Sequence, residues 1–166
     1  MKVGAFSIFT AILIATLFLV GCAGEEEAAE APEEEAAAEP IVIGVSKIVS
    51  HPALDAIEQG IQDELAALGY ENVNYDLQNA NGDMTTAASI ATKFKNDDVD
   101  LAVGIATPTS QALVNAIDET PVVYAAVTDP VDAGLVDSFD QGGENVTGVS
   151  DLTPVRAQIE MLQRIA

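Results

Sequence analysis

The sequence predicts an α/β fold: a doubly wound parallel sheet with a flavodoxin-like strand order. Two observations lead to this prediction. Short apolar, β-branched runs alternate along the chain with segments whose apolar residues recur at helical spacing. The runs at 41–49 and 101–106 are also continuously apolar over several residues, which is typical of strands buried on both faces of a parallel sheet.

The first half of the folded region contains two strand-helix pairs. Residues 41–49 (IVIGVSKIV) predict a first, central strand. A helix is expected after Pro52 and before Gly69, a plausible stop, because apolar side chains recur at helical spacing at Leu54, Ile57, Ile61, Leu65 and Leu68. Residues 73–77 then predict a second strand. The polar stretch 78–83 predicts a turn, and 84–94 a helix with Ala and Ile on its buried side.

The second half repeats this alternation. A third strand is expected at 101–106, followed by a helix that reaches Ile117. Its start lies in the turn Thr107–Ser110, where hydroxyl side chains are candidate N-caps and Pro108 suits an early helical position. Further strands are expected at 121–127 and 145–150. A last helix begins near Thr153, with a shared apolar face formed by Val155, Ile159, Leu162 and Ile165.

Composition limits the classes of partner. The chain has 166 residues, with 27 Asp and Glu against six Lys and Arg, giving a formal net charge of −21. Nucleic-acid affinity depends largely on cationic contacts to phosphate, so nucleic acid is not an expected partner. The acidity fits a solvated surface or a solubility device. The length fits one modest domain with additional segments.

The N-terminus predicts a bacterial lipoprotein signal peptide over residues 1–22. Lys2 supplies the positive region, and residues 8–20 form an apolar core too short for an ordinary spanning helix. The segment ends in LVGC, which resembles the signal at which cleavage exposes Cys22 for lipidation; the alternative is an uncleaved anchor. Either case places the rest of the chain on the outer face of the cytoplasmic membrane or in the periplasm.

Residues 23–40 are almost entirely Ala, Glu and Pro, with too few large apolar groups to form a core. We expect them to form a disordered tether that holds the following domain away from the membrane. A transient helix is the alternative for this segment. The expected organisation is thus a signal peptide (1–22), a tether (23–40), a binding lobe (41–152) and a final segment (153–166).

The candidate ligand site lies at the carboxyl edge of the sheet, where the turns after the first, third and fourth strands meet. Hydroxyls, one His, one carboxylate, Lys47 and backbone amides there suit a small polar or zwitterionic molecule. The candidate ligand-binding residues are Ser50, His51, Thr107, Pro108, Thr109, Ser110, Thr128 and Asp129. Each also has a purely structural reading: packing against a helix start for His51, helix capping for the hydroxyls and turn formation for Asp129.

Common catalytic motifs are missing from the sequence. It contains no G-x-S-x-G elbow, no H-E-x-x-H zinc helix, no phosphate-binding loop and no dinucleotide fingerprint. The stretch 79–83 fails as a calcium loop, since its aligned frame places Leu77 and Ala88 at ligand positions. No catalytic residue, metal or cofactor is therefore predicted. An extracytoplasmic enzyme using Asp129 with Ser50 or His51, and a ligand sensor for a membrane receptor, remain alternatives.

Four ordered stretches then resemble a known family: SHPALDAIEQGIQDEL, VGIATPTSQAL, PVVYAAVTDPVDAGLV and NVTGVSD. They are similar to ABC-transporter substrate-binding lipoproteins of the type I periplasmic-binding-protein fold, in the group associated with tryptophan and tyrosine uptake. The resemblance implies two α/β lobes that close over a ligand and deliver it to a membrane permease driven by an ATPase. It also implies that the first lobe contacts the ligand through Thr107–Ser110 and Thr128–Asp129. The binding protein of such a system catalyses no reaction.

A complete member of that family continues into a second lobe of comparable size. By this resemblance the sequence is expected to be an N-terminal fragment, in which 153–166 begins the crossover into the missing lobe. The apolar face of that last helix would then lack its partner. We expect weak closure on ligand, because half a cleft buries less of a ligand than a whole one.

Overall fold

The computed structural model describes residues 39–165, which all fall within one compact unit spanning Ala37–Ala166. The expected signal peptide, with Cys22, and nearly all of the expected tether lie outside the described residues. Among residues 39–165, no helix has both the length and the apolar character needed to cross a membrane.

A five-stranded parallel sheet forms the centre of the domain, with the strand order β2-β1-β3-β4-β5. This confirms the predicted fold class and its flavodoxin-like order. The order reverses between β1 and β3, which is where such sheets bind ligands. The strands are β1 (Ile41–Lys47), β2 (Val73–Asn79), β3 (Leu101–Ile105), β4 (Val122–Val127) and β5 (Val146–Ser150).

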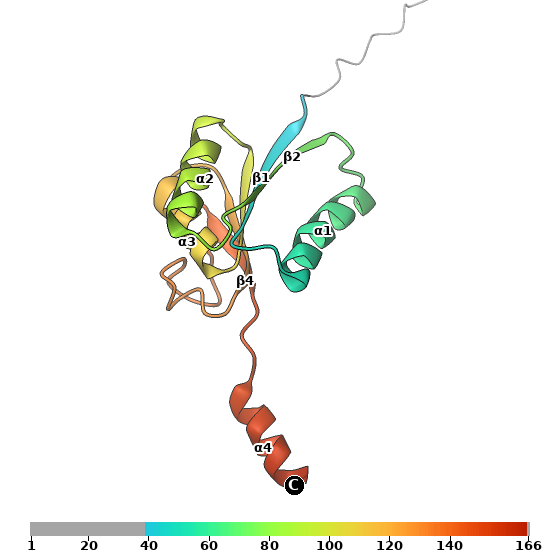
Figure 1. Ribbon diagram of the computed structural model, residues 1–166, viewed down its shortest axis with the longest axis vertical. Helices are drawn as coiled ribbons and strands as arrows, with labels where there is room; N and C mark the ends of the chain where they lie inside the picture. Colours follow the sequence, from blue (N-terminus) through green and yellow to red (C-terminus); the bar gives the residue numbers. More distant parts are fainter. Residues whose placement is uncertain (1–38, 166) are drawn as a thin grey trace, which may run out of the picture. The chain divides into compact units, whose positions relative to one another are not determined.

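The helices divide between the two faces of the sheet. Figure 1 shows α1 (Pro52–Ala67) on one side, and α2 (Met84–Asn96) and α3 (Thr107–Ala116) on the other. The core of the α2 and α3 side includes the buried residues Ala87, Ile90, Ala91 and Phe94, which confirms the predicted buried face of α2. The α1 side is a smaller cluster around Ile43, Val45, Val103 and Ile105.

One glycine sets how closely α2 approaches the sheet. A Cβ at Gly44 would lie 2.8 Å from the Phe94 ring, and Phe94 is fully buried. The absence of a side chain in the middle of β1 therefore admits Phe94, the largest fully buried side chain among residues 39–165.

Several predicted boundaries differ by one or two residues from those in the structure, among them the ends of β1 and β2. β1 ends at Lys47, two residues before the end of the apolar run, and β2 extends to Asn79. The reason is pairing: β1 and β2 remain in register to the pair Lys47 and Asn79, after which both strands leave the sheet. Periodicity in either segment alone does not contain this information.

The last helix, α4 (Val155–Ile165), confirms the helix expected at this position. Every residue in it is exposed, so it has no part in the core of the domain. Its apolar face therefore lacks a partner among the described residues.

Candidate functional site

The turn between β3 and α3 begins with an unusual backbone at Ala106. This residue is the N-cap of α3, with φ 79° and ψ 158°, and makes no side-chain cap. The expectation that Thr107–Ser110 supply the N-cap is therefore wrong. The physical reason is that the chain leaves β3 through the positive φ of Ala106, so the four polar residues already belong to the helix.

Two of the expected ligand-binding hydroxyls in this turn bind backbone carbonyls. Thr109 Oγ1 donates to the Ile105 carbonyl oxygen at 2.7 Å. Ser110 Oγ makes contacts of 3.0 Å with the Gly104 oxygen and 2.9 Å with the Ala106 oxygen. Both residues are fully buried. These hydroxyls therefore anchor α3 to the end of β3 rather than capping the helix.

The outer part of the same turn is open to a ligand. Thr107 and Pro108 are only partly buried. As the first residue of α3, Thr107 has a backbone N–H without an intrahelical acceptor, and Ala106 supplies no side-chain cap. The N-terminus of a helix also favours negative charge. Thr107 therefore offers both a hydroxyl and a helix N-terminus to an anionic group such as a carboxylate.

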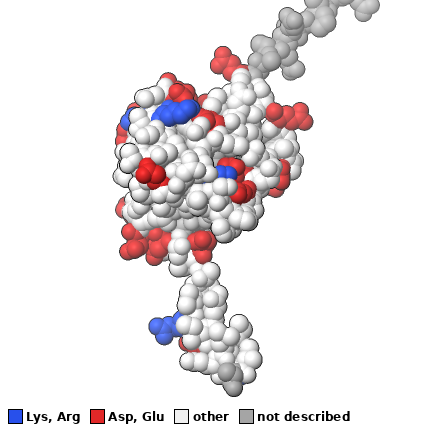
Figure 2. All heavy atoms as spheres, in the orientation of Figure 1, with Lys and Arg blue, Asp and Glu red and all other residues white. Residues whose placement is uncertain are grey.

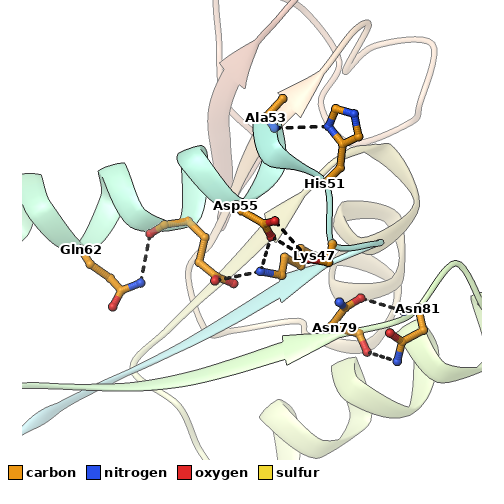
Figure 3. A network of polar contacts seen from close by, with 9 residues as sticks. Lys47, His51, Ala53, Asp55, Gln62, Asn79 and Asn81 are labelled. Carbon is orange, nitrogen blue, oxygen red and sulfur yellow. Dashed lines mark hydrogen bonds and ion pairs between the residues drawn. The ribbon is translucent and has the colours of Figure 1, made fainter.

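The turn between β1 and α1 presents Ser50 and His51, both of which are exposed. His51 is the N-cap of α1, and its Nδ1 accepts the Ala53 N–H at 3.2 Å (Figure 3). An accepting Nδ1 requires the neutral ring to carry its proton on Nε2. His51 can thus cap the helix and still donate a hydrogen bond from Nε2. The Ser50 hydroxyl donates to Asp55 Oδ2 at 3.0 Å.

Lys47, the last residue of β1, forms an ion-pair network beneath this turn (Figure 3). Its Nζ lies 2.7 Å from Asp55 Oδ1 and 2.9 Å from Glu58 Oε1. The hydrogen bond to Asp55 raises the pKa of Lys47, with a further contribution from Glu58 that opposes burial. The hydrogen bond from Lys47 in turn lowers the pKa of Asp55. The network fixes the N-terminal half of α1 against the end of β1.

Sequence reasoning missed this network. The signal was a lysine at the end of a strand, followed by two acids three positions apart on one side of the next helix.

The turn between β2 and α2 joins the same edge, although sequence reasoning treated it only as a connection. Ala80 N–H donates to the Lys47 carbonyl oxygen at 2.9 Å, and Gly82 N–H to the Ile48 carbonyl oxygen at 2.7 Å. Asn79 Oδ1 accepts the N–H of Asn81 at 2.8 Å, and Asn81 has a positive φ of 53°. This places two amide side chains beside the turn that follows β1 (Figure 3).

The turn after β4 contains Thr128 and Asp129. Asp129 Oδ1 accepts the N–H groups of Val131 at 3.1 Å and Asp132 at 2.9 Å, so this carboxylate forms the turn. Thr128 Oγ1 donates to Asp151 Oδ1 at 3.0 Å, which links the ends of β4 and β5. Thr128 is exposed and Asp129 is partly buried.

The eight sequence-predicted residues therefore all follow strand ends at one edge of the sheet, but they differ in access. Six are exposed or partly buried, namely Ser50, His51, Thr107, Pro108, Thr128 and Asp129, whereas Thr109 and Ser110 are enclosed. Within residues 39–165, no group of three His, Cys, Asp or Glu side chains could hold a metal ion. Among the charged side chains on the visible face, carboxylates are widespread and cations are few (Figure 2).

A doubly wound lobe with polar turns at the carboxyl edge of its sheet belongs to the class of small-ligand-binding domains. The sequence model of the ABC transporter substrate binding protein family matches residues 42–166. The chain belongs to this family.

A curated relative is the tyrosine-binding protein of Clostridioides difficile. It is 43% identical over 126 residues, which make up 74% of this chain and 36% of that protein. The chain thus spans little more than a third of this relative's length.

Two solved structures support the fold. A conserved domain protein of Vibrio cholerae is 48% identical with a TM-score of 0.73, and the match covers 75% of this chain and 43% of that one. An ABC domain of Streptococcus pneumoniae, solved in complex with L-Trp, is 44% identical with a TM-score of 0.72. This match also covers 75% of this chain and 43% of that one. The matched region is therefore less than half of each solved chain.

Proposed function

We propose that this chain is the first lobe of the solute-binding component of an ABC importer. The component captures an amino acid or similar small molecule outside the cytoplasmic membrane and delivers it to permease and ATPase subunits. The observation that carries the proposal is the family match over residues 42–166. The names of two relatives support the ligand class, since one is called tyrosine-binding and the other was solved with L-Trp.

The geometry of the lobe suits the two charged groups of an amino acid. The ligand carboxylate would lie at the start of α3, where Thr107 offers a hydroxyl and a backbone N–H at the positive end of the helix. The ligand ammonium group would lie toward Asp129, the carboxylate of the β4 turn. His51 would contribute its Nε2–H from the first turn.

Binding and release are the whole of this proposed role, and no residue is assigned a catalytic one. In this proposal the ligand would be enclosed between this lobe and a second one, and the match to only 36% and 43% of two relatives' lengths leaves room for such a lobe. A single lobe contacts only one side of the ligand, so we expect residues 1–166 on their own to bind it weakly.

Lipidation at Cys22 forms part of the proposal and follows from the LVGC sequence. It would hold the domain at the outer face of the membrane through the tether 23–40. Metabolic labelling with a radioactive or clickable fatty acid tests it. Label should enter the wild-type chain and be lost in Cys22→Ser, while labelling that persists in Cys22→Ser would contradict the assignment.

Isothermal titration calorimetry of the chain with L-tyrosine and L-tryptophan tests the transport-related function. We expect weak heats of binding with either amino acid, and none with tyramine or tryptamine, which lack the carboxylate. Equal binding of the amines would show that the start of α3 does not recognise the carboxylate.

A further inference from the structure

Thr128, the residue after β4, is tied to the end of β5 through both its side chain and its backbone. Its Oγ1 donates to Asp151 Oδ1 at 3.0 Å, and its carbonyl oxygen accepts a hydrogen bond of 2.7 Å from Ser150 Oγ. The Asp151 N–H donates to the Val127 carbonyl oxygen at 3.2 Å. The backbones of Thr128 and Asp151 are therefore both held in place, which fixes the hydrogen bond between their side chains.

The direction of this hydrogen bond decides what the Thr128 hydroxyl can offer to a ligand. A hydroxyl has one proton to donate and lone pairs that accept, whereas an ionised carboxylate only accepts. The proton of Thr128 Oγ1 therefore points to Asp151, and only the lone pairs of this oxygen remain for a ligand. In this state Thr128 can accept from an ammonium group but has no side-chain proton to donate to a carboxylate.

Asp129, the next residue, also offers an acceptor. Its Oδ1 accepts the N–H groups of Val131 and Asp132, so Oδ2 is the oxygen that it can present to a ligand. Residues 127–152 contain no Lys, Arg or His, so no cationic side chain of this segment competes for these oxygens. The end of β4 thus presents acceptors, while the start of α3 presents the donors of Thr107.

We propose that Asp151 is a positioning residue that sets the orientation of the bound amino acid. By holding the Thr128 hydroxyl as an acceptor, it directs the ligand ammonium group to the end of β4 and leaves the ligand carboxylate to the start of α3. Asp151 acts through Thr128 and is not assigned a contact with the ligand. The inference rests on the proposed function, because it concerns the same site.

The affinities for two matched ligands test the proposal. L-tryptophan carries both charged groups, whereas indole-3-propionate has the same ring and carboxylate without the ammonium group. NMR titrations of the isotope-labelled chain of 166 residues give a dissociation constant for each. The constant for indole-3-propionate divided by that for L-tryptophan measures selection of the ammonium group. We call this quotient the selection ratio.

Asp151→Ala should lower the selection ratio by about tenfold, the effect of losing one hydrogen bond to a charged group. The loss should fall on L-tryptophan, and binding of indole-3-propionate should not weaken. Asp140→Ala is the matched control, because it removes an exposed carboxylate from the segment between β4 and β5. This variant should keep the wild-type selection ratio. The amide spectra of the same samples report whether each variant is folded.

A double-mutant cycle separates action through Thr128 from direct attraction by the Asp151 charge. In a chain that carries Thr128→Val the hydroxyl is absent, so adding Asp151→Ala should change the selection ratio by less than about twofold. A tenfold fall that persists in this background would overturn the inference, since Asp151 would then act on the ammonium group directly.

Two further results of the single substitution would also overturn the inference: an unchanged selection ratio in Asp151→Ala, or an equal loss of affinity for both ligands. The second result would show that Asp151 only stabilises the fold. These outcomes leave the proposed function standing, because L-tryptophan still binds the wild-type chain. Absence of any shift with either ligand in the wild-type chain would instead overturn the proposed function and the inference together.

Discussion

The backbone N–H of Ala106 donates a hydrogen bond of 2.9 Å to the carbonyl oxygen of Ala125. This contact ties the end of β3 to β4, immediately before both strands enter candidate ligand-binding turns. Positive φ angles lie on both sides of this contact, 79° at Ala106 and 53° at Ala126. The pairing of β4 with β5 also shifts register between Ala125 and Val127. Non-glycine residues in these regions are strained, and such strain gathers at functional sites.

The first prediction concerns the strain at Ala106. Ala106→Gly should raise the free energy of unfolding by about 1 kcal/mol, because relief of an unfavourable backbone conformation outweighs the added flexibility of Gly. Ala88→Gly, on the exposed side of α2, is the matched control and should lower it by about 1 kcal/mol. Urea denaturation measures both. Equal destabilisation by the two variants would show that Ala106 stores no strain.

The second prediction concerns the approach of α3 to β3. A Cβ at Gly104 would lie 2.7 Å from the Cα of Ser110, which is backbone and cannot move aside alone. Gly104→Ala should therefore destabilise the domain by about 1–3 kcal/mol. Gly60→Ala, on α1 with open space around its Cβ, should instead stabilise it by about 0.5–1 kcal/mol. Thermal unfolding compares the pair, and a neutral Gly104→Ala would contradict the close packing.

The third prediction concerns the Lys47 and Asp55 pair. Removing the hydrogen bond from Lys47 in Lys47→Met should return the pKa of Asp55 toward its usual value, since that bond is the main cause of its lowering. An NMR titration of the Asp55 carboxyl measures this. Lys95→Met, which breaks only the exposed pair with Asp118, should leave the Asp55 titration unchanged. An unshifted Asp55 in Lys47→Met would refute the pairing.

The sign of the pH dependence follows from the same shifts. The pKa of Asp55 is lower in the folded state, so its contribution to stability is present above the usual carboxylate range and is lost as pH falls through the folded pKa. The pKa of Lys47 is raised, so its contribution is lost as pH rises through the folded value. Lys47→Met should therefore flatten the stability profile at both its acid and its alkaline end.

The order of the strands and helices could be read from the sequence because it rests on local patterns. The continuous apolar run at 101–106 and the spacing of Ile57, Ile61 and Leu65 each identify an element without reference to the rest of the chain. The alternation of strands and helices alone predicts that a ligand binds at the carboxyl edge of the sheet.

Access to individual side chains could not be read in this way. Whether Thr109 and Ser110 face a ligand or the sheet depends on how closely α3 approaches Gly104, a tertiary distance with no local signal. The positive φ of Ala106 was equally hidden, because Ala has no preference for that region. Pairing of Lys47 with Asp55 required the direction in which α1 crosses the sheet.

The central claim is that the carboxyl edge of this lobe binds the charged groups of an amino acid, and residue-specific NMR tests it most directly. In a titration of the isotope-labelled chain with L-tryptophan, we predict that the amide signals of Thr107, Thr128 and His51 shift together, with tryptamine giving smaller changes at Thr107. Shifts confined to residues away from the carboxyl edge, or no shifts at all, would contradict the account.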